Sequence, residues 1–165
     1  MTPRIAAELQ GSGFDAVSIG VQSFQHRILR HLQRPTTAAV NRRAVALARE
    51  QFACVDVDLI FDVAYDGPLA LLDDLEQAFA FGVDQVSTYP LMRFGYTPFG
   101  KARHERRAEH RLLRRASDLA ASRGYHRTRS GPSPATARPG TPPLPGPTTW
   151  GSAPVPPLTP VTCSP

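Results

Sequence analysis

Residues 55–60 read Val-Asp-Val-Asp-Leu-Ile, a short run in which β-branched and other apolar residues flank two acidic ones. This composition is typical of a buried strand. Side chains alternate along a strand, so Asp56, Asp58 and Ile60 should lie on one face, with Val57 and Leu59 on the other. A carboxylate within an apolar strand is costly unless it has a partner. Asp58 is therefore either a ligand-facing residue or a structural acid held by an arginine, and the pattern alone does not choose between them.

Helices and strands alternate on both sides of this run. On its N-terminal side we expect a strand at residues 16–21 and a helix that Thr36 or Thr37 caps. On its C-terminal side we expect a helix at residues 69–81 and a strand at residues 86–91. Spacings of roughly 30 to 40 residues between strands predict right-handed crossovers and a parallel sheet. Further helices are expected at residues 3–10, 25–32 and 101–122.

Three strands of this kind do not close a barrel. They would leave sheet edges that parallel folds normally cover. The predicted fold class is α/β, a partial (βα) barrel of the TIM type with parallel strands and outer helices, followed by a disordered tail. We assign residues 1–125 to the barrel part.

The tail comprises residues 126–165. Twelve of the 17 prolines lie between Pro132 and Pro165, and Arg138 carries the only charge after Arg129. Such a segment has little apolar surface to bury and many breaks in its backbone hydrogen bonding, which predicts disorder. A proline-rich ligand for SH3-like domains is a less favoured interpretation.

The net charge of +5 is local in origin. Residues 93–129 hold eleven Lys or Arg against Glu105, Glu109 and Asp118. A basic helix of this kind binds nucleic acid or anionic lipid in some proteins, but a solvated face is the commoner case. We therefore expect no nucleic-acid partner. No apolar run approaches the roughly 20 residues of a membrane span, and no signal peptide is expected, so the predicted location is cytoplasmic.

Three segments, one of them the run around Asp58 described above, fall where strands of a parallel sheet end, which is where such folds gather functional groups. Gln22 is the first polar residue past the first strand, and its amide could both donate to and accept from a ligand. The same segment could be only a helix-entry turn capped by Ser23. The stretch Ser87–Met92, which contains Pro90, could likewise be an ordinary strand-ending turn. The five histidines and two cysteines lack the spacing of a metal site.

Taken together, these segments resemble a known family. The segments that carry the likeness are Val17–Phe24 (VSIGVQSF), Leu32–Pro35 (LQRP), Asp56–Ile60 (DVDLI), Val86–Leu91 (VSTYPL) and Thr97–Phe99 (TPF). In this order and at similar separations they resemble the oxygen-independent coproporphyrinogen III oxidase family of radical S-adenosylmethionine proteins. The likeness covers about residues 3–125, and the segment around Gln22 is its most specific part.

The resemblance implies a three-quarter (βα)6 barrel that binds S-adenosylmethionine beside a [4Fe–4S] cluster and acts on a tetrapyrrole. By motif, Gln22 would bond the ribose or methionine portion, and Arg34 would pair with the cofactor carboxylate. Asp58 would accept from a ribose hydroxyl. Met92 would lie near the adenine through its backbone.

The chain also departs from the family. The family's C-x3-C-x2-C motif has no counterpart here, since Cys54 and Cys163 are the only cysteines. Asp62-Val63-Ala64 stands where the family has Gly-Leu-Pro. We therefore expect a fragment of a radical S-adenosylmethionine oxidoreductase that is inactive by itself, with no catalytic or metal-ligating residue assigned and no cofactor stably bound. Whether the chain is an enzyme, its substrate and its oligomeric state stay open.

Two alternatives come from other functional classes. One is a non-catalytic half-barrel that binds a nucleotide-like ligand or a tetrapyrrole. The other is a basic helical adaptor that binds nucleic acid through residues 103–115.

The tail suggests a reason for the truncation. In a GC-rich gene, the codons of residues 150–154 can encode Leu-Gly-Leu-Gly-Ala when the frame begins one base earlier. This peptide resembles a family motif at about this distance after the barrel. We hypothesise a shift of reading frame near residues 125–129, with an ordinary proline-rich linker as the alternative. The nucleotide sequence decides between them.

Overall fold

The computed structural model describes residues 1–63, 69–92, 106–129 and 148–152. Five helices and five strands are described in these ranges. The helices are α1 (Pro3–Gly11), α2 (His26–His31), α3 (Ala38–Gln51), α4 (Ala70–Ala80) and α5 (Arg106–Ser122). The strands are β1 (Ala16–Gln22), β2 (Cys54–Phe61), β3 (Gln85–Pro90), β4 (Tyr125–Arg129) and β5 (Thr148–Ser152).

The strands form one sheet in the order β1-β2-β3-β5-β4. β1 pairs with β2, and β2 with β3, both in parallel. This confirms the predicted α/β fold with parallel strands and crossover helices. The pairing of Gly20 with Asp58 and of Asp58 with Ser87 sets the register of the three strands. They end together at one edge of the sheet, which we call the carboxyl edge.

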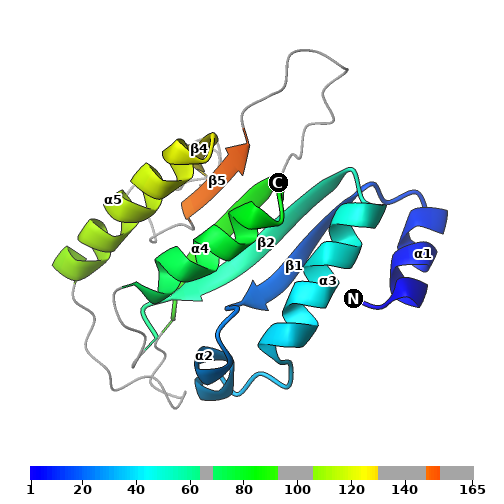
Figure 1. The fold of residues 1–165 in the computed structure, drawn as a ribbon, viewed down its shortest axis with the longest axis horizontal. Helices are drawn as coiled ribbons and strands as arrows, with labels where there is room; N and C mark the ends of the chain where they lie inside the picture. Colours follow the sequence, from blue (N-terminus) through cyan, green and yellow to red (C-terminus); the bar gives the residue numbers. More distant parts are fainter. Residues whose placement is uncertain (64–68, 93–105, 130–147, 153–165) are drawn as a thin grey trace, which may run out of the picture.

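The helices pack on one side of this sheet, where α3 lies over β1 and β2 and α4 lies over β2 (Figure 1). Val57, Leu59 and Val86 point to this side and are fully buried. They pack with residues of the helices, among them Val45 of α3 and Leu75 of α4. At about 25 cal/mol per Å² of buried apolar surface, this layer is the main stabilising contribution of the fold.

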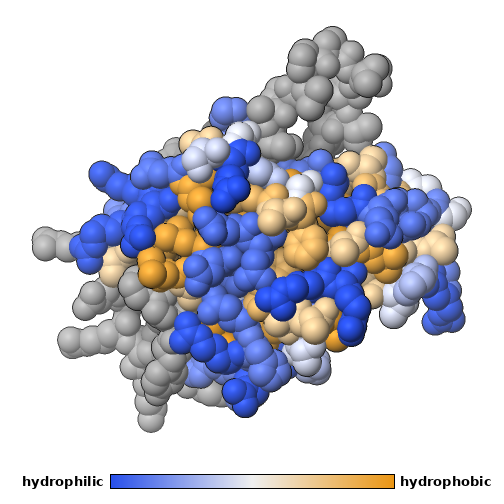
Figure 2. All heavy atoms as spheres, viewed as in Figure 1, coloured by the Kyte–Doolittle hydropathy of each residue, from blue (hydrophilic) through white to orange (hydrophobic). Residues whose placement is uncertain are grey.

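Threonines cap two of the helices, α1 and α3. Thr2 accepts from the backbone N–H of Ile5, and Thr37 accepts from that of Val40, so both threonines satisfy donors at a helix start. Figure 2 shows hydrophilic side chains over much of the helical side, with smaller hydrophobic areas between them. Among the described helices, none is long and apolar enough to cross a bilayer.

The prediction of a disordered tail is wrong for two segments. β4 begins at Tyr125 and pairs antiparallel with β5, and β5 pairs antiparallel with β3. β3 would otherwise present unpaired backbone groups along its edge, and β5 satisfies them. Tyr125 is also buried and its hydroxyl donates to the carbonyl of Val83, which anchors β4. Residues 130–147 and 153–165 of the predicted tail lie outside the described residues.

Candidate functional site at the carboxyl edge of the sheet

The sheet face opposite the helices is polar. Ser18, Asp56, Asp58 and Ser87 share this face, and we call these four residues the polar face. The Ser18 hydroxyl lies 3.1 Å from Oδ2 of Asp56 and 3.2 Å from Oδ2 of Asp58. Ser87 donates to Asp56 at 3.2 Å. The predicted alternation of Asp56 and Asp58 against Val57 and Leu59 is confirmed, and Asp58 has a serine rather than an arginine beside it.

The surroundings raise the pKa of both carboxyls on the polar face. Burial raises the pKa of Asp56, and the charge of Asp58 raises it further. Burial also raises the pKa of Asp58, while its hydrogen bond from Ser18 acts in the opposite direction. Burial, and then the charges of Asp58 and Asp56, raise the pKa of Tyr89, so its phenol remains a donor at neutral pH. The face therefore offers carboxylate acceptors with a hydroxyl donor next to them.

Gln22 is the last residue of β1, at the carboxyl edge, and it pairs with Leu59, the residue after Asp58. Its backbone has φ of +66°, and the N–H of Ser23 donates to the carbonyl of Val21 at 2.8 Å. This is a γ-turn with positive φ, the rarer and strained of the two γ-turn forms. The turn coincides with a shift of register between Gly20 and Gln22. As a result the Gln22 side chain folds back over Gly20, the residue that pairs with Asp58.

Asn41 of α3 holds this turn from the helical side. Its Nδ2 donates to the carbonyls of Val21 and Ser23, at 2.8 and 3.0 Å. Its Oδ1 accepts from the hydroxyl of Thr36. Because both amide hydrogens are committed to the carbonyls on either side of Gln22, Asn41 opposes relaxation of the left-handed backbone. Strained residues persist where surrounding contacts over-determine them, and they cluster at functional sites.

A second left-handed residue follows the neighbouring strand. Asp62, the first residue after β2, has φ of +62°. The N–H of Leu91 donates to the carbonyl of Phe61 and ties the end of β3 to the same place. Two adjacent parallel strands thus end in backbone conformations that non-glycine residues rarely adopt.

The other two predicted site residues, Arg34 and Met92, follow α2 and β3, and both are exposed. Arg34 is exposed and follows α2, whose last turn closes with bonds from Gln33 to Arg30 and from Arg34 to Leu29. α2 lies near the carboxyl end of β1 (Figure 1). Met92 lies two residues past β3 and its side chain is 60% exposed. The geometry therefore brings Gln22 and Asp58 together, and the cofactor roles predicted for all four residues stay predictions.

Sequence reasoning missed Ser18, Ser87 and Asn41. Ser18 and Ser87 had a signal, because each occupies the strand position that pairs with an aspartate on β2. Asn41 had only a weak one, as a polar residue on the buried side of a helix. The segment around residues 97–99 lies outside the described residues.

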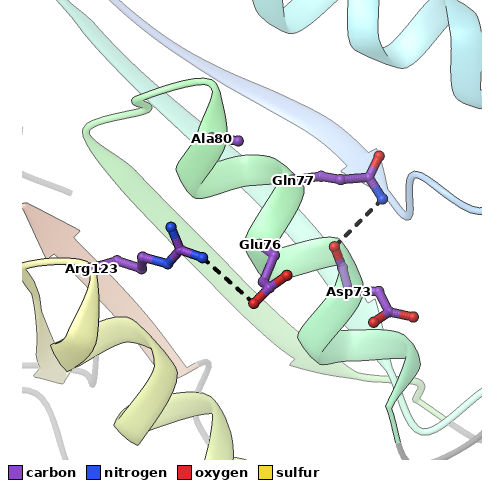
Figure 3. Close-up of a pocket in the computed structure, with 5 residues that line it drawn as sticks. All are labelled: Asp73, Glu76, Gln77, Ala80 and Arg123. Carbon is purple, nitrogen blue, oxygen red and sulfur yellow. Dashed lines mark hydrogen bonds and ion pairs between the residues drawn. The ribbon is translucent and has the colours of Figure 1, made fainter.

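A cavity of about 410 Å³ lies elsewhere, between α4 and the end of α5. Figure 3 shows its lining residues, with Arg123 directed at Glu76, an ion pair of 3.6 Å. It belongs to the helical side of the molecule, so the sheet separates it from Asp56 and Asp58. Within the described ranges, no group of three acidic, histidine or cysteine side chains could hold a metal ion.

Comparisons with known proteins bear on the family resemblance and on the fold. No protein-family model matches the chain. The heme chaperones HemW of Mycobacterium tuberculosis, strains CDC 1551 / Oshkosh and ATCC 25618 / H37Rv, are each 33% identical to it over 94 residues. The match covers 54% of this chain and 23% of theirs, so the chain spans less than a quarter of these relatives.

A solved structure has the same fold. Coproporphyrinogen III oxidase (HemN) from Escherichia coli, a radical SAM enzyme, aligns with 92% of this chain and 33% of its own, at a TM-score of 0.69 and 18% identity. The sequence likeness to HemW and the fold shared with HemN confirm the predicted resemblance: part of this chain is similar in sequence to the heme chaperones HemW, and its fold is similar to one part of the HemN structure.

Proposed function

We propose that the polar face of this chain holds the adenosyl portion of S-adenosylmethionine for a HemN-like radical S-adenosylmethionine protein. The single observation that carries this proposal is the placement of the Gln22 amide over Gly20, the strand partner of Asp58, at the carboxyl edge of a parallel sheet. Ligands of αβ folds bind at this edge.

The residues present fit a nucleoside. A ribose offers hydroxyl donors, and Asp58 offers a half-buried carboxylate to accept them. At Asp58 the Ser18 hydroxyl contacts Oδ2 and not Oδ1, which leaves Oδ1 available to a ligand within the described residues. The Gln22 amide supplies both a donor and an acceptor beside it. Together they suit a ligand with hydroxyl groups on a sugar ring.

Arg34 and Met92 enter the proposal through the family motifs. Arg34 would pair with the carboxylate of the methionine portion, and within the described ranges its guanidinium has no ion-pair partner to displace. Met92 would present its backbone to the adenine. Their placement near the carboxyl ends of β1 and β3 supports these roles.

The [4Fe–4S] cluster does not fit the residues of this chain. The [4Fe–4S] cluster of radical S-adenosylmethionine proteins needs three cysteine thiolates, and these 165 residues contain two cysteines, Cys54 and Cys163. Cys54 is the first residue of β2, at the sheet edge opposite Gln22 and Asp58. We therefore propose that this chain is inactive alone, and that cluster-binding cysteines, where they act with it, come from residues outside these 165.

The tetrapyrrole substrate also belongs to the proposal. The relatives are a heme chaperone and a coproporphyrinogen III oxidase, so tetrapyrroles are the substrate class we propose for the complete protein. We propose a cytoplasmic location for it. We also propose that the reading frame shifts near residues 125–129. No observation favours nucleic acid as a partner, although Arg111, Arg114 and Arg115 of α5 are exposed.

The test is binding of S-adenosylmethionine to the 165-residue chain, measured by isothermal titration calorimetry. Asp58→Asn and Gln22→Ala should each weaken binding about tenfold or more, as expected for a lost hydrogen bond to a charged or buried group. Asp118→Asn, a change of the same type at an exposed position of α5, is the matched control. Wild-type binding that none of these variants alters would refute the site. Haemin binding without S-adenosylmethionine binding would favour the non-catalytic module instead.

A further inference from the structure

Asp74 of α4 is a buried carboxylate next to the Gln22 turn. It is 2% exposed, and its oxygens accept from three donors of the segment that follows β1. The donors are the Ser23 hydroxyl at 2.6 Å, the Phe24 backbone N–H at 3.0 Å and the Gln25 Nε2 at 3.4 Å. Asp74 thus connects a helix to the turn at the carboxyl edge.

The three partners match the ionised form of Asp74. The Ser23 oxygen already accepts from the backbone N–H of Gln25 at 3.0 Å, so its single hydrogen is left to donate to Asp74. If Asp74 were protonated, a second hydrogen would lie between its Oδ2 and the Ser23 oxygen. Only one hydrogen can bridge this pair of oxygens, so the other would lose its acceptor. Protonation should therefore loosen the turn.

The surroundings oppose this ionised form. Burial raises the pKa of Asp74 to about 6, the charge of Asp73 on the same helix adds to the rise, and the three hydrogen bonds lower it. Two cations contact the segment that follows the turn: Arg42 of α3 donates to the carbonyl of Phe24, and Arg27 of α2 donates to Oε1 of Gln25. A buried acid in this balance changes its charge within an accessible pH range.

Ser23 carries the effect to Gln22. Its N–H closes the γ-turn on the carbonyl of Val21, its carbonyl accepts from Asn41, and its hydroxyl donates to Asp74. Every polar group of Ser23 is thus engaged in holding the residue after Gln22. A shift of Ser23 would change the backbone angles of Gln22 and with them the direction of its amide.

We infer that Asp74 is a positioning residue whose ionised carboxylate, acting through Ser23, fixes the left-handed turn at Gln22, so that ligand binding at the polar face responds to pH. The response of the turn depends on no ligand. The response of binding rests on the function proposed above.

The first test follows the turn directly by NMR of the ¹³C,¹⁵N-labelled chain between about pH 4.5 and about pH 8. The Phe24 backbone N–H and the Gln22 side-chain amide should shift with the same midpoint as the Asp74 carboxyl carbon. In Asp74→Asn these shifts should disappear, while Asp73→Asn, an exposed neighbour on the same helix, should retain them. The inference is overturned if the Gln22 amide shift does not change as Asp74 ionises, or if its titration persists in Asp74→Asn.

The second test uses S-adenosylmethionine as the probe, at about pH 5 and about pH 7.5. The wild type should bind about tenfold more weakly at the lower pH, and Asp74→Asn should bind weakly at both. Asp74→Asn should also be no less stable than the wild type at the higher pH. If Asp74 had only a structural role, Asp74→Asn would lose stability and binding in parallel, and that result would overturn the inference. If S-adenosylmethionine binds at neither pH while the NMR titration is intact, the positioning role is supported and the proposed function is refuted.

Discussion

The Nε2 atom of Gln22 lies 2.7 Å from the point that a Cβ atom on residue 20 would occupy. Gly20 thus leaves the space into which the Gln22 amide folds. Since Gly20 pairs with Asp58, this one absent side chain allows the amide to lie over the strand partner of Asp58 at the carboxyl edge.

Gly20→Ala tests this packing. The new methyl group should push the Gln22 amide away, because real Cβ atoms do not approach other atoms so closely, and S-adenosylmethionine affinity should fall about tenfold. Stability should change by less than about 1 kcal/mol, because the displaced group is the end of a flexible side chain. Gly11→Ala, where nothing lies within 4 Å of the added atom, is the matched control for calorimetry and urea unfolding. Unchanged affinity in Gly20→Ala would contradict the packing.

The left-handed backbone of Gln22 gives a second prediction. Gln22→Gly removes the side chain and relieves the positive φ, whereas Gln22→Ala removes the side chain and retains it. Gln22→Gly should therefore unfold with a free energy about 1 kcal/mol higher than Gln22→Ala, although both should bind ligand weakly. Urea denaturation compares the two. Equal stabilities would mean that the turn carries no strain.

Asp74 should make the free energy of unfolding depend on pH. Its pKa is raised to about 6 in the folded state, against about 4 in an unfolded chain, so the folded state binds the proton more tightly. This contribution is fully present below about pH 4 and is lost as pH rises through about 6. Relative to Asp74→Asn, the wild type should lose on the order of 2 to 3 kcal/mol across this window. Urea unfolding at both ends of the window measures the difference, and a constant difference would be incompatible with the buried charge.

Asp56 gives a prediction of the same sign. Burial and the charge of Asp58 raise its pKa, so ionisation of Asp56 opposes folding as pH rises above its ordinary range. Asp56→Asn should therefore be more stable than the wild type at neutral pH, and the advantage should shrink in acid. Thermal unfolding at two pH values checks this, with exposed Asp118→Asn as the control. A variant that is less stable than the wild type at neutral pH would show that the hydrogen bonds of Asp56 outweigh its burial.

Local periodicity in the sequence carries most of the fold. The strand around Asp58 and the helices before and after it could be predicted, because alternation with period two and apolar stripes with period 3.6 are local signals. The antiparallel pairing of β5 could not be predicted, because β5 lies in a proline-rich segment and its partner, β3, is about sixty residues earlier in the chain. No local pattern in residues 148–152 indicates which strand they pair with.

The site was predictable in its residue types and less so in its geometry. Gln22 and Asp58 stood out because each is a polar group at or near the end of a strand. The positive φ of Gln22 has no local signal, since it is imposed by Asn41 and by the contacts of Ser23 from other elements. Asp74 resembled any acidic residue beside Asp73 on a helix, and only tertiary packing distinguishes the buried acid from the exposed one.

The central claim is that Gln22 and Asp58 hold one ligand together. A double-mutant cycle of Gln22→Ala and Asp58→Asn, with S-adenosylmethionine binding measured by calorimetry, tests it most directly. We predict that the two changes are non-additive by about 1 kcal/mol or more, because neighbouring groups on one ligand are coupled. Losses that add to within about 0.3 kcal/mol would contradict the claim, since independent sites behave in that way.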